Sequence, residues 1–262
     1  FIFFGWLSDK IGRKLIIMAG CLIAALSYFT LFPALLNYAN PALAAAQAKS
    51  KVTVASDAKN CSFQGSPIAR EIDFTTSCDI AKRTLAQSFI PYSNVTAGSG
   101  AAAVVKIGDK EITAPTAKLN AEGHGFDKES AAAIAAFKKE VSEAAKAAGL
   151  LTKAEDKSMN LPVVLGILTI LVIFVTMVYG PIAAMLVELF PTRIRYTSMS
   201  LPYHIGNGWF GGLLPTTAFA MVAATGDIYY GLWYPVIVAL GTFVIGMLFV
   251  RETKDVDIYA KD

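Results

Sequence analysis

Four long apolar stretches divide the chain. They cover residues 15–36, 161–187, 198–224 and 228–250, and none of them contains Asp, Glu, Lys or Arg. Each is at least 22 residues long, whereas a helix needs about 20 residues to cross a hydrocarbon core of roughly 30 Å. The pattern predicts four transmembrane helices embedded in a lipid bilayer.

The first five residues are also apolar. They lack the basic start and the cleavage region of a signal peptide. Residues 1–5 are therefore interpreted as the end of a further helix, and the chain as a fragment of a larger membrane protein.

A polar segment separates the first two stretches. Residues 37–160 hold 15 of the 23 Lys and Arg and 13 of the 20 Asp and Glu. The whole chain is 55% hydrophobic and 16% charged, with a mean hydropathy of +0.51, which argues against an ordinary soluble protein. The net charge of +3 is small and scattered, so nucleic acid is excluded as a partner.

The short loops predict the orientation in the cell membrane. If four helices alternate, residues 9–14, residues 188–197 and the C-terminal tail lie on one face, and all three are basic. The opposite short loop, 225–227, has no basic residue. Since cytoplasmic loops are enriched in Lys and Arg, the basic face is cytoplasmic. Residues 37–160 are then extracytoplasmic.

Two elements give this extracytoplasmic segment the pattern of a small α+β domain. In residues 104–113, a turn at Gly108 and Asp109 predicts a hairpin. Its register places Lys106 opposite Glu111. The second element is a helix capped by Asp127 and ended by Gly149. Its apolar stripe consists of Ile134, Phe137, Val141 and Ala145.

The cysteines fit an extracytoplasmic segment. Cys61 and Cys78 lie 17 positions apart in a compartment where disulfides persist, so we expect them to pair, with two free thiols as the alternative. Cys21 lies within the first apolar stretch, where a single cysteine is usually a packing residue.

The segment offers no catalytic or metal chemistry. His124 has no second histidine or cysteine at ligand spacing. The sequence also lacks a phosphate loop, a nucleophile elbow and a Cys-x-x-Cys pair. We therefore expect no metal, no cofactor and no enzymatic activity.

The first basic loop carries a specific motif. Residues 5–14 read GWLSDKIGRK, and the spacing Gly-x-x-x-Asp-[Arg/Lys]-x-Gly-Arg-[Arg/Lys] resembles the signature loop of the major facilitator superfamily. In that family the loop lies between helices two and three, and again between helices eight and nine. The resemblance implies a transporter whose fold is an all-α transmembrane bundle.

The second basic loop agrees with this resemblance. Residues 188–197 read ELFPTRIRYT, which is similar to the loop after helix ten in the sugar-porter and metabolite:proton symporter branches. Residues 203–208, YHIGNG, are most similar to the second branch. Residues 1–36 are then the end of helix eight, the signature loop and helix nine. Residues 37–160 form an inserted domain, and residues 161–262 form helices ten to twelve and the tail.

The resemblance also implies a conformational gate in the cytoplasmic loops. Asp9 would meet the positive end of a neighbouring helix and the side chain of Arg13, and would hold the inner ends of the bundle together in the outward-facing state. A solvated anchoring loop is the alternative. The predicted gate residues are Gly5, Asp9, Lys10, Gly12, Arg13, Lys14, Glu188, Arg193 and Arg195.

One apolar stretch carries polar groups of interest. His204 and Asn207 lie about one turn apart, among glycines and between Pro202 and Pro215. They are candidates for proton coupling or solute contact. A gating or packing hydrogen bond is favoured for His204, because it lies near the cytoplasmic end.

These observations predict a secondary transporter, a proton-coupled symporter of a small organic acid or osmolyte, that works by alternating access. Its partners would be the solute, protons and the missing N-terminal half of the same transporter. The alternative is a membrane-anchored sensor or solute-binding protein that uses the outside domain.

Overall fold

The computed structural model describes residues 1–154 and 157–256, which fold into two compact units. The helical unit comprises Phe1–Phe32, Leu161–Leu214 and the described part of Leu232–Asp262. The mixed unit comprises Pro33–Asn160 and Pro215–Gly231. Residues 215–231 thus pack with the polar segment.

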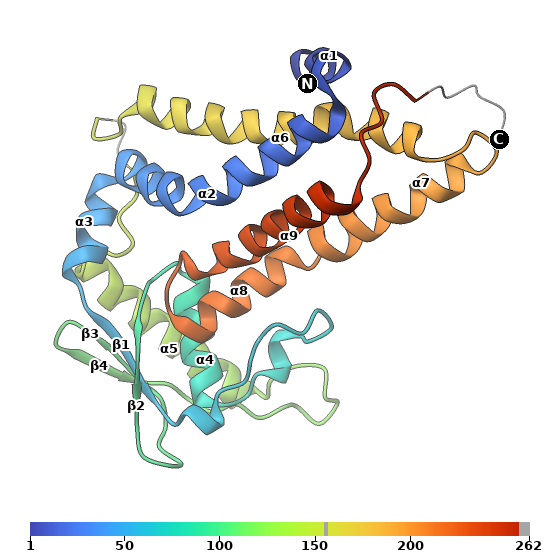
Figure 1. Ribbon diagram of the computed structural model, residues 1–262. Helices are drawn as coiled ribbons and strands as arrows, with labels where there is room; N and C mark the ends of the chain where they lie inside the picture. The colour runs from blue at the N-terminus through green and yellow to red at the C-terminus, as the bar shows by residue number, and fades with distance from the viewer. Residues whose placement is uncertain (155–156, 257–262) are drawn as a thin grey trace. The chain divides into compact units, whose positions relative to one another are not determined.

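Long apolar helices make up most of the helical unit (Figure 1). Within the described residues, three helical stretches are long and apolar enough to cross a membrane. The helices of the apolar parts are α1 (Ile2–Ile11), α2 (Arg13–Ala39), α6 (Leu161–Leu189), α7 (Arg195–His204), a π-helical segment (Ile205–Gly211), α8 (Leu214–Thr225), a 3-10 turn (Tyr230–Leu232) and α9 (Trp233–Phe249).

The predicted span at residues 198–224 is not one continuous α-helix. The π-helical segment separates α7 from α8. Glycine weakens helices and proline removes a backbone donor, and this stretch contains four glycines together with Pro202 and Pro215. A fourth uninterrupted span is therefore not found among the described residues.

A four-stranded sheet forms the centre of the mixed unit. Its strands are β1 (Val52–Ser56), β2 (Ser93–Thr96), β3 (Val104–Ile107) and β4 (Lys110–Thr113), in the order β2-β1-β3-β4. β1 and β2 are parallel, and the other pairs are antiparallel. The unit also contains α3 (Pro41–Lys49), α4 (Ser77–Gln87), α5 (Lys128–Ala147) and short 3-10 turns at Ala58–Asn60 and Glu71–Asp73.

The core lies between one face of this sheet and two helices. Val54 of β1, Val105 of β3, Leu85 of α4 and Val141 of α5 are fully buried in one apolar cluster. Alternate strand residues point to the same face, so the buried residues of β1 and β3 define the covered side. α4 and α5 lie behind the strands in Figure 1. The expected α+β arrangement is therefore present.

Both elements predicted for this segment are confirmed. In the β3–β4 hairpin Lys106 faces Glu111, with 3.0 Å between Nζ and Oε1, and Val105 faces Ile112. α5 is capped by Asp127, whose side chain accepts a hydrogen bond from the Ser130 N–H. The four residues of its predicted stripe are buried.

The polar segment begins and ends at one place. The Asn160 N–H donates a 2.9 Å hydrogen bond to the Tyr38 carbonyl, and the Asn40 side chain donates to the Thr152 carbonyl at 2.8 Å. A domain whose ends meet can interrupt a helical chain without separating the helices that flank it. Cys61 and Cys78 are joined by a disulfide, with Cα atoms 5.3 Å apart, and Cys21 is free and buried.

Candidate functional site

The signature sequence forms a sharp break between two helices. Residues 5–11 belong to α1, so the expected loop is largely helical. The break occurs at Gly12, which has a φ of +113° and donates its N–H to the Ser8 carbonyl at 3.0 Å. Only glycine adopts such a conformation readily. Gly12 therefore allows α1 and α2 to be separated by a single residue.

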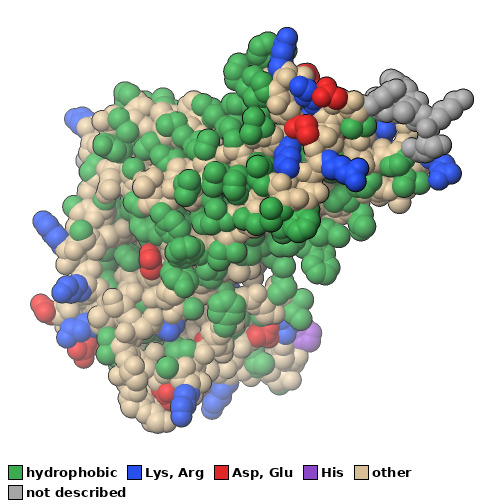
Figure 2. Space-filling model, in the orientation of Figure 1, with side chains coloured by type: hydrophobic (Ala, Val, Ile, Leu, Met, Phe, Trp, Pro, Cys, Tyr) green, Lys and Arg blue, Asp and Glu red, His purple; other side chains and the backbone are tan. Residues whose placement is uncertain are grey.

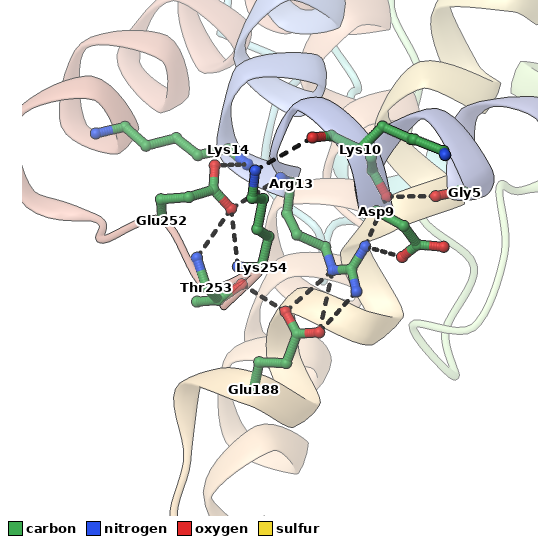
Figure 3. A network of polar contacts seen from close by, with 10 residues as sticks. Gly5, Asp9, Lys10, Arg13, Lys14, Glu188, Glu252, Thr253 and Lys254 are labelled. Atoms are coloured by element: carbon green, nitrogen blue, oxygen red, sulfur yellow. Dashed lines mark hydrogen bonds and ion pairs between the residues drawn. The ribbon is translucent and has the colours of Figure 1, made fainter. Parts of the chain in front are cut away.

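Arg13 and Glu188 form the centre of a polar network in the helical unit (Figure 3). Arg13 Nη2 lies 2.7 Å from Glu188 Oε1, and Arg13 Nε lies 3.0 Å from Glu188 Oε2. This bidentate geometry is the strong form of an arginine–carboxylate pair. The side chains are only 10% and 12% exposed, so the pair joins α2 to the end of α6 away from solvent.

Asp9 and Ser8 both contact Nη1 of Arg13. The Asp9 carboxylate contacts Arg13 Nη1, as the resemblance implied, but its side chain is 61% exposed. The Ser8 hydroxyl accepts a 2.9 Å hydrogen bond from the same Nη1 and donates to the Gly5 carbonyl at 2.6 Å. Asp9 is thus at the solvent edge of the network, while Glu188 is its protected partner.

Glu252 places a carboxylate on the N-terminus of α2. It accepts hydrogen bonds from the backbone N–H groups of Arg13 at 2.8 Å and Lys14 at 3.1 Å. The N–H groups of Thr253 and Lys254 donate to it as well. Partial burial by itself would raise the pKa of Glu252. The four N–H donors stabilise the charged carboxylate by more than that, so the pKa of Glu252 lies below its ordinary value. Glu252 therefore provides a carboxylate at the start of α2, and the role at a helix end that the resemblance implies for Asp9 stays a prediction.

The C-terminal tail closes the network with two further contacts. The Thr253 hydroxyl donates to Glu188 Oε2 at 2.7 Å, and Lys254 Nζ donates to the Lys10 carbonyl at 3.2 Å. Glu252 and Thr253 were not among the predicted gate residues. Glu252 is the second residue after the last apolar stretch, where charged residues are common, so its position alone did not mark it.

Other predicted gate residues lie around this network or apart from it. Lys14 Nζ donates to the Met247 carbonyl near the end of α9 at 2.8 Å. Arg195 Nε donates to the Phe190 carbonyl at 3.1 Å, which links the two ends of the α6–α7 connection. Arg193 is exposed in that connection.

His204 and Asn207 lie at the change from α-helix to π-helix. His204 ends α7, with its ring against Tyr203 at 5.9 Å between centroids. The Asn207 amide accepts a 3.3 Å hydrogen bond from the Tyr179 hydroxyl of α6 and donates to the Tyr203 carbonyl. Asn207 thus connects the π-helical segment to α6. Across the described residues, no cluster of three His, Cys, Asp or Glu could hold a metal ion.

Replacement of Gly12 by alanine is expected to disconnect the tail from α2. A Cβ at this position would lie 2.4 Å from Glu252 Oε2, in a backbone conformation that alanine disfavours. We expect a loss of about 1–3 kcal/mol, measured as a lower unfolding temperature of the purified protein in detergent. Gly5→Ala is the matched control, because a Cβ there meets no atom within 4 Å. Equal effects of the two substitutions would contradict the close fit.

The surface of the long helices is mostly apolar. Apolar side chains cover much of the visible face of the helices in Figure 2. Among the exposed ones, Leu248 and Phe249 at the end of α9 are 71% and 77% exposed. Exposed apolar surface of this extent is typical of helices that face lipid or further membrane helices. With the three candidate spans, it identifies a multi-pass membrane protein.

Comparison with known proteins shows similarity to transporters. Residues 141–261 match the family described as "Sugar (and other) transporter". A Haemophilus influenzae protein named for metabolite transport is 37% identical over 86 residues, which are 31% of this chain and 18% of that protein. A second such protein from this organism is 38% identical over 80 residues, 29% of this chain and 17% of its own.

The name of a third relative mentions both a solute and protons. The citrate-proton symporter of Salmonella typhi is 35% identical over 82 residues, 31% of this chain and 19% of its own length. Each match therefore spans less than a fifth of the relative. No solved structure is significantly similar to the chain. The resemblance to the major facilitator superfamily, which the two loops predicted, is confirmed by these matches.

Proposed function

We propose that the chain supplies helices nine to twelve of a twelve-helix secondary transporter, which moves a small organic solute together with protons. The observation that carries this proposal is the Arg13–Glu188–Glu252 network, which joins the start of α2, the end of α6 and the C-terminal tail. It brings together the signature sequence and the second basic loop. A transporter that rocks between two states needs such ends to move together.

The network would act as an inner gate. In the proposed orientation, residues 9–14, residues 188–197 and the tail are cytoplasmic, and residues 37–160 lie outside the inner or plasma membrane. Arg13 and Glu188 would keep the inner helix ends assembled. Asp9, which is exposed, would tune the gate without holding it, because water screens its contact with Arg13.

Proton coupling and solute contact would involve the irregular helix. π-Helical turns are frequent at functional sites, and Asn207 accepts a hydrogen bond from Tyr179 of α6. His204 lies about one turn before Asn207, and its imidazole is the kind of side chain that can carry a proton. Together they are the proposed coupling or solute-contact residues. The organic-acid class of the solute is supported by the name of the citrate-proton relative.

Uptake by the full-length protein in lipid vesicles tests the proposal. With an inward proton gradient, we expect accumulation of a labelled solute from a panel of organic acids, beginning with citrate, and of osmolytes. Dissipation of the gradient should abolish the accumulation. If no member of the panel gives gradient-driven flux, symport is wrong. Solute binding without flux would instead support the sensor or binding-protein alternative.

Neutralisation of Asp9 is expected to change the gate without unfolding it. Because the Asp9–Arg13 contact is exposed, Asp9→Asn should shift the conformational equilibrium, and hence the uptake rate, by about two- to fivefold. Asp109→Asn, an equally exposed carboxylate in the β3–β4 turn, is the matched control. Unaltered uptake in Asp9→Asn would remove Asp9 from the proposed gate.

A further inference from the structure

The polar segment holds the last turn of α8 through the residues that lead into β2. The Tyr92 N–H donates a 2.9 Å hydrogen bond to the Gly226 carbonyl, and the buried Tyr92 hydroxyl donates to the Ala223 carbonyl. The final carbonyl groups of a helix have no partner within the helix. Tyr92 therefore supplies partners for the end of α8 from a segment about 130 residues away.

Asn94 supplies the next partners. Its side-chain N–H group donates to the carbonyls of Ala224 at 3.0 Å and Thr225 at 3.1 Å. Asn94 lies in β2, at the edge of the sheet, and β2 pairs with the central strand β1. The end of α8 is thus bonded to the framework of the mixed unit.

Gly226 permits this close approach. It has a φ of +83° and follows directly after α8. A Cβ at Gly226 would lie 2.0 Å from the Tyr92 carbonyl oxygen and 2.7 Å from the Tyr92 ring. No side chain fits at that distance, so both the backbone conformation and the contact require glycine.

A second contact reaches further along α8. The Arg83 guanidinium of α4 lies 5.3 Å from the ring of Phe219 in α8 and 5.3 Å from the ring of Phe74 in the polar segment. Phe219 precedes Thr225 by six residues, about 9 Å along a helix axis. Arg83 Nη1 also donates a 3.2 Å hydrogen bond to the side-chain oxygen of Gln64. Cation–π contacts of this kind are attractive within about 6 Å.

We propose that the domain between α2 and α6 is a clamp on the C-terminal end of α8. The clamp has two parts: the Tyr92 and Asn94 donors that cap the helix, and the Arg83 side chain that binds it one and a half turns earlier. The same domain starts at the end of α2 and returns to that point through the bond between Asn160 and Tyr38. It therefore joins the end of α8 to the last turn of α2.

The clamp gives the inserted domain a mechanical role. An α-helix that ends at an irregular segment on one side, as α8 does at the π-helical turn, depends on external contacts for its position. In this chain the polar segment supplies such contacts through Tyr92, Asn94 and Arg83. The role does not rest on transport, because a sensor with the same fold would transmit a change in its outside domain through the same contacts.

Hydrogen–deuterium exchange of the full-length protein in nanodiscs tests the clamp. Asn94→Ala removes the donor to two carbonyl groups, and we expect exchange of peptides covering residues 219–227 to accelerate by about 5- to 30-fold. Ser93→Ala is the matched control, since Ser93 is the exposed neighbour in the same strand. Exchange in the peptides of Val54 and Val105 should stay unchanged, which shows that the domain remains folded.

A second variant tests the other part of the clamp, the contact of Arg83 with Phe219. Arg83→Gln removes the cation between Phe74 and Phe219, and should accelerate exchange around residue 219 more than at residue 225. If both variants leave α8 exchange within twofold of the Ser93→Ala control while the domain core stays protected, the clamp is overturned. This outcome is independent of solute uptake, so it distinguishes failure of the clamp from failure of the transporter proposal.

Discussion

Substitution of Arg13 by alanine is expected to destabilise the helical unit by about 3–5 kcal/mol, because it leaves the Glu188 carboxylate without its protected cationic partner. The two side chains are 10% and 12% exposed, so water cannot replace the lost bonds. The Thr253 hydroxyl would remain as the partner of Glu188. Thermal unfolding of the purified protein in detergent, followed by circular dichroism, measures the loss.

Arg193→Ala provides the comparison for this result. Arg193 is an exposed arginine in the connection that follows α6, and exposed charges contribute about 0–1 kcal/mol. The double variant Arg13→Ala and Glu188→Gln should be more stable than Arg13→Ala alone, because Glu188→Gln removes the carboxylate charge that Arg13→Ala leaves unpaired. Equal unfolding temperatures for Arg13→Ala and Arg193→Ala would refute the central place of Arg13.

Loss of the Cys61–Cys78 disulfide is expected to destabilise the mixed unit by about 3 kcal/mol. The bond closes a loop of 17 residues, and the chain-entropy model gives a stabilisation of this size for such a loop. The double substitution Cys61→Ala and Cys78→Ala should therefore lower the denaturant concentration at which the mixed unit becomes sensitive to protease.

The free cysteine supplies the control for the disulfide. Cys21→Ala changes a cysteine that is buried in α2 and not bonded, so it should leave protease sensitivity of the mixed unit unaltered. Dithiothreitol should reproduce the effect of the double substitution in the natural protein and have no effect on the double variant. An unchanged midpoint in the double variant would show that the bond does not stabilise the unit.

Local patterns predicted the parts of the structure that depend on neighbouring residues. The β3–β4 register follows from the two-residue turn at Gly108 and Asp109, which fixes every pair that follows it. The buried stripe of α5 follows from the 3.6-residue period. The Asp9–Arg13 contact joins residues four apart in sequence, a spacing that a motif can carry.

Long-range contacts could not be predicted in the same way. Arg13 and Glu188 are 175 positions apart, and Arg13 and Glu252 are 239 apart. No period or turn relates such positions, so no partner of Glu188 could be predicted and Glu252 was not among the predicted site residues. The bonds of Asn94 to the end of α8 join residues 130 and 131 positions apart, and no local pattern indicates them either.

The sequence by itself determined that this protein lies in a membrane, because the length and apolarity of a stretch are sufficient to make it a span. It also determined the family resemblance, because both loops are short and contiguous. Only the tertiary structure decided which carboxylate protects Arg13, where the apolar stretch at 198–224 is interrupted, and which domain holds α8. These depend on backbone geometry at Gly12 and Gly226 and on donors brought together from distant segments, whose contacts exist only after the chain has folded.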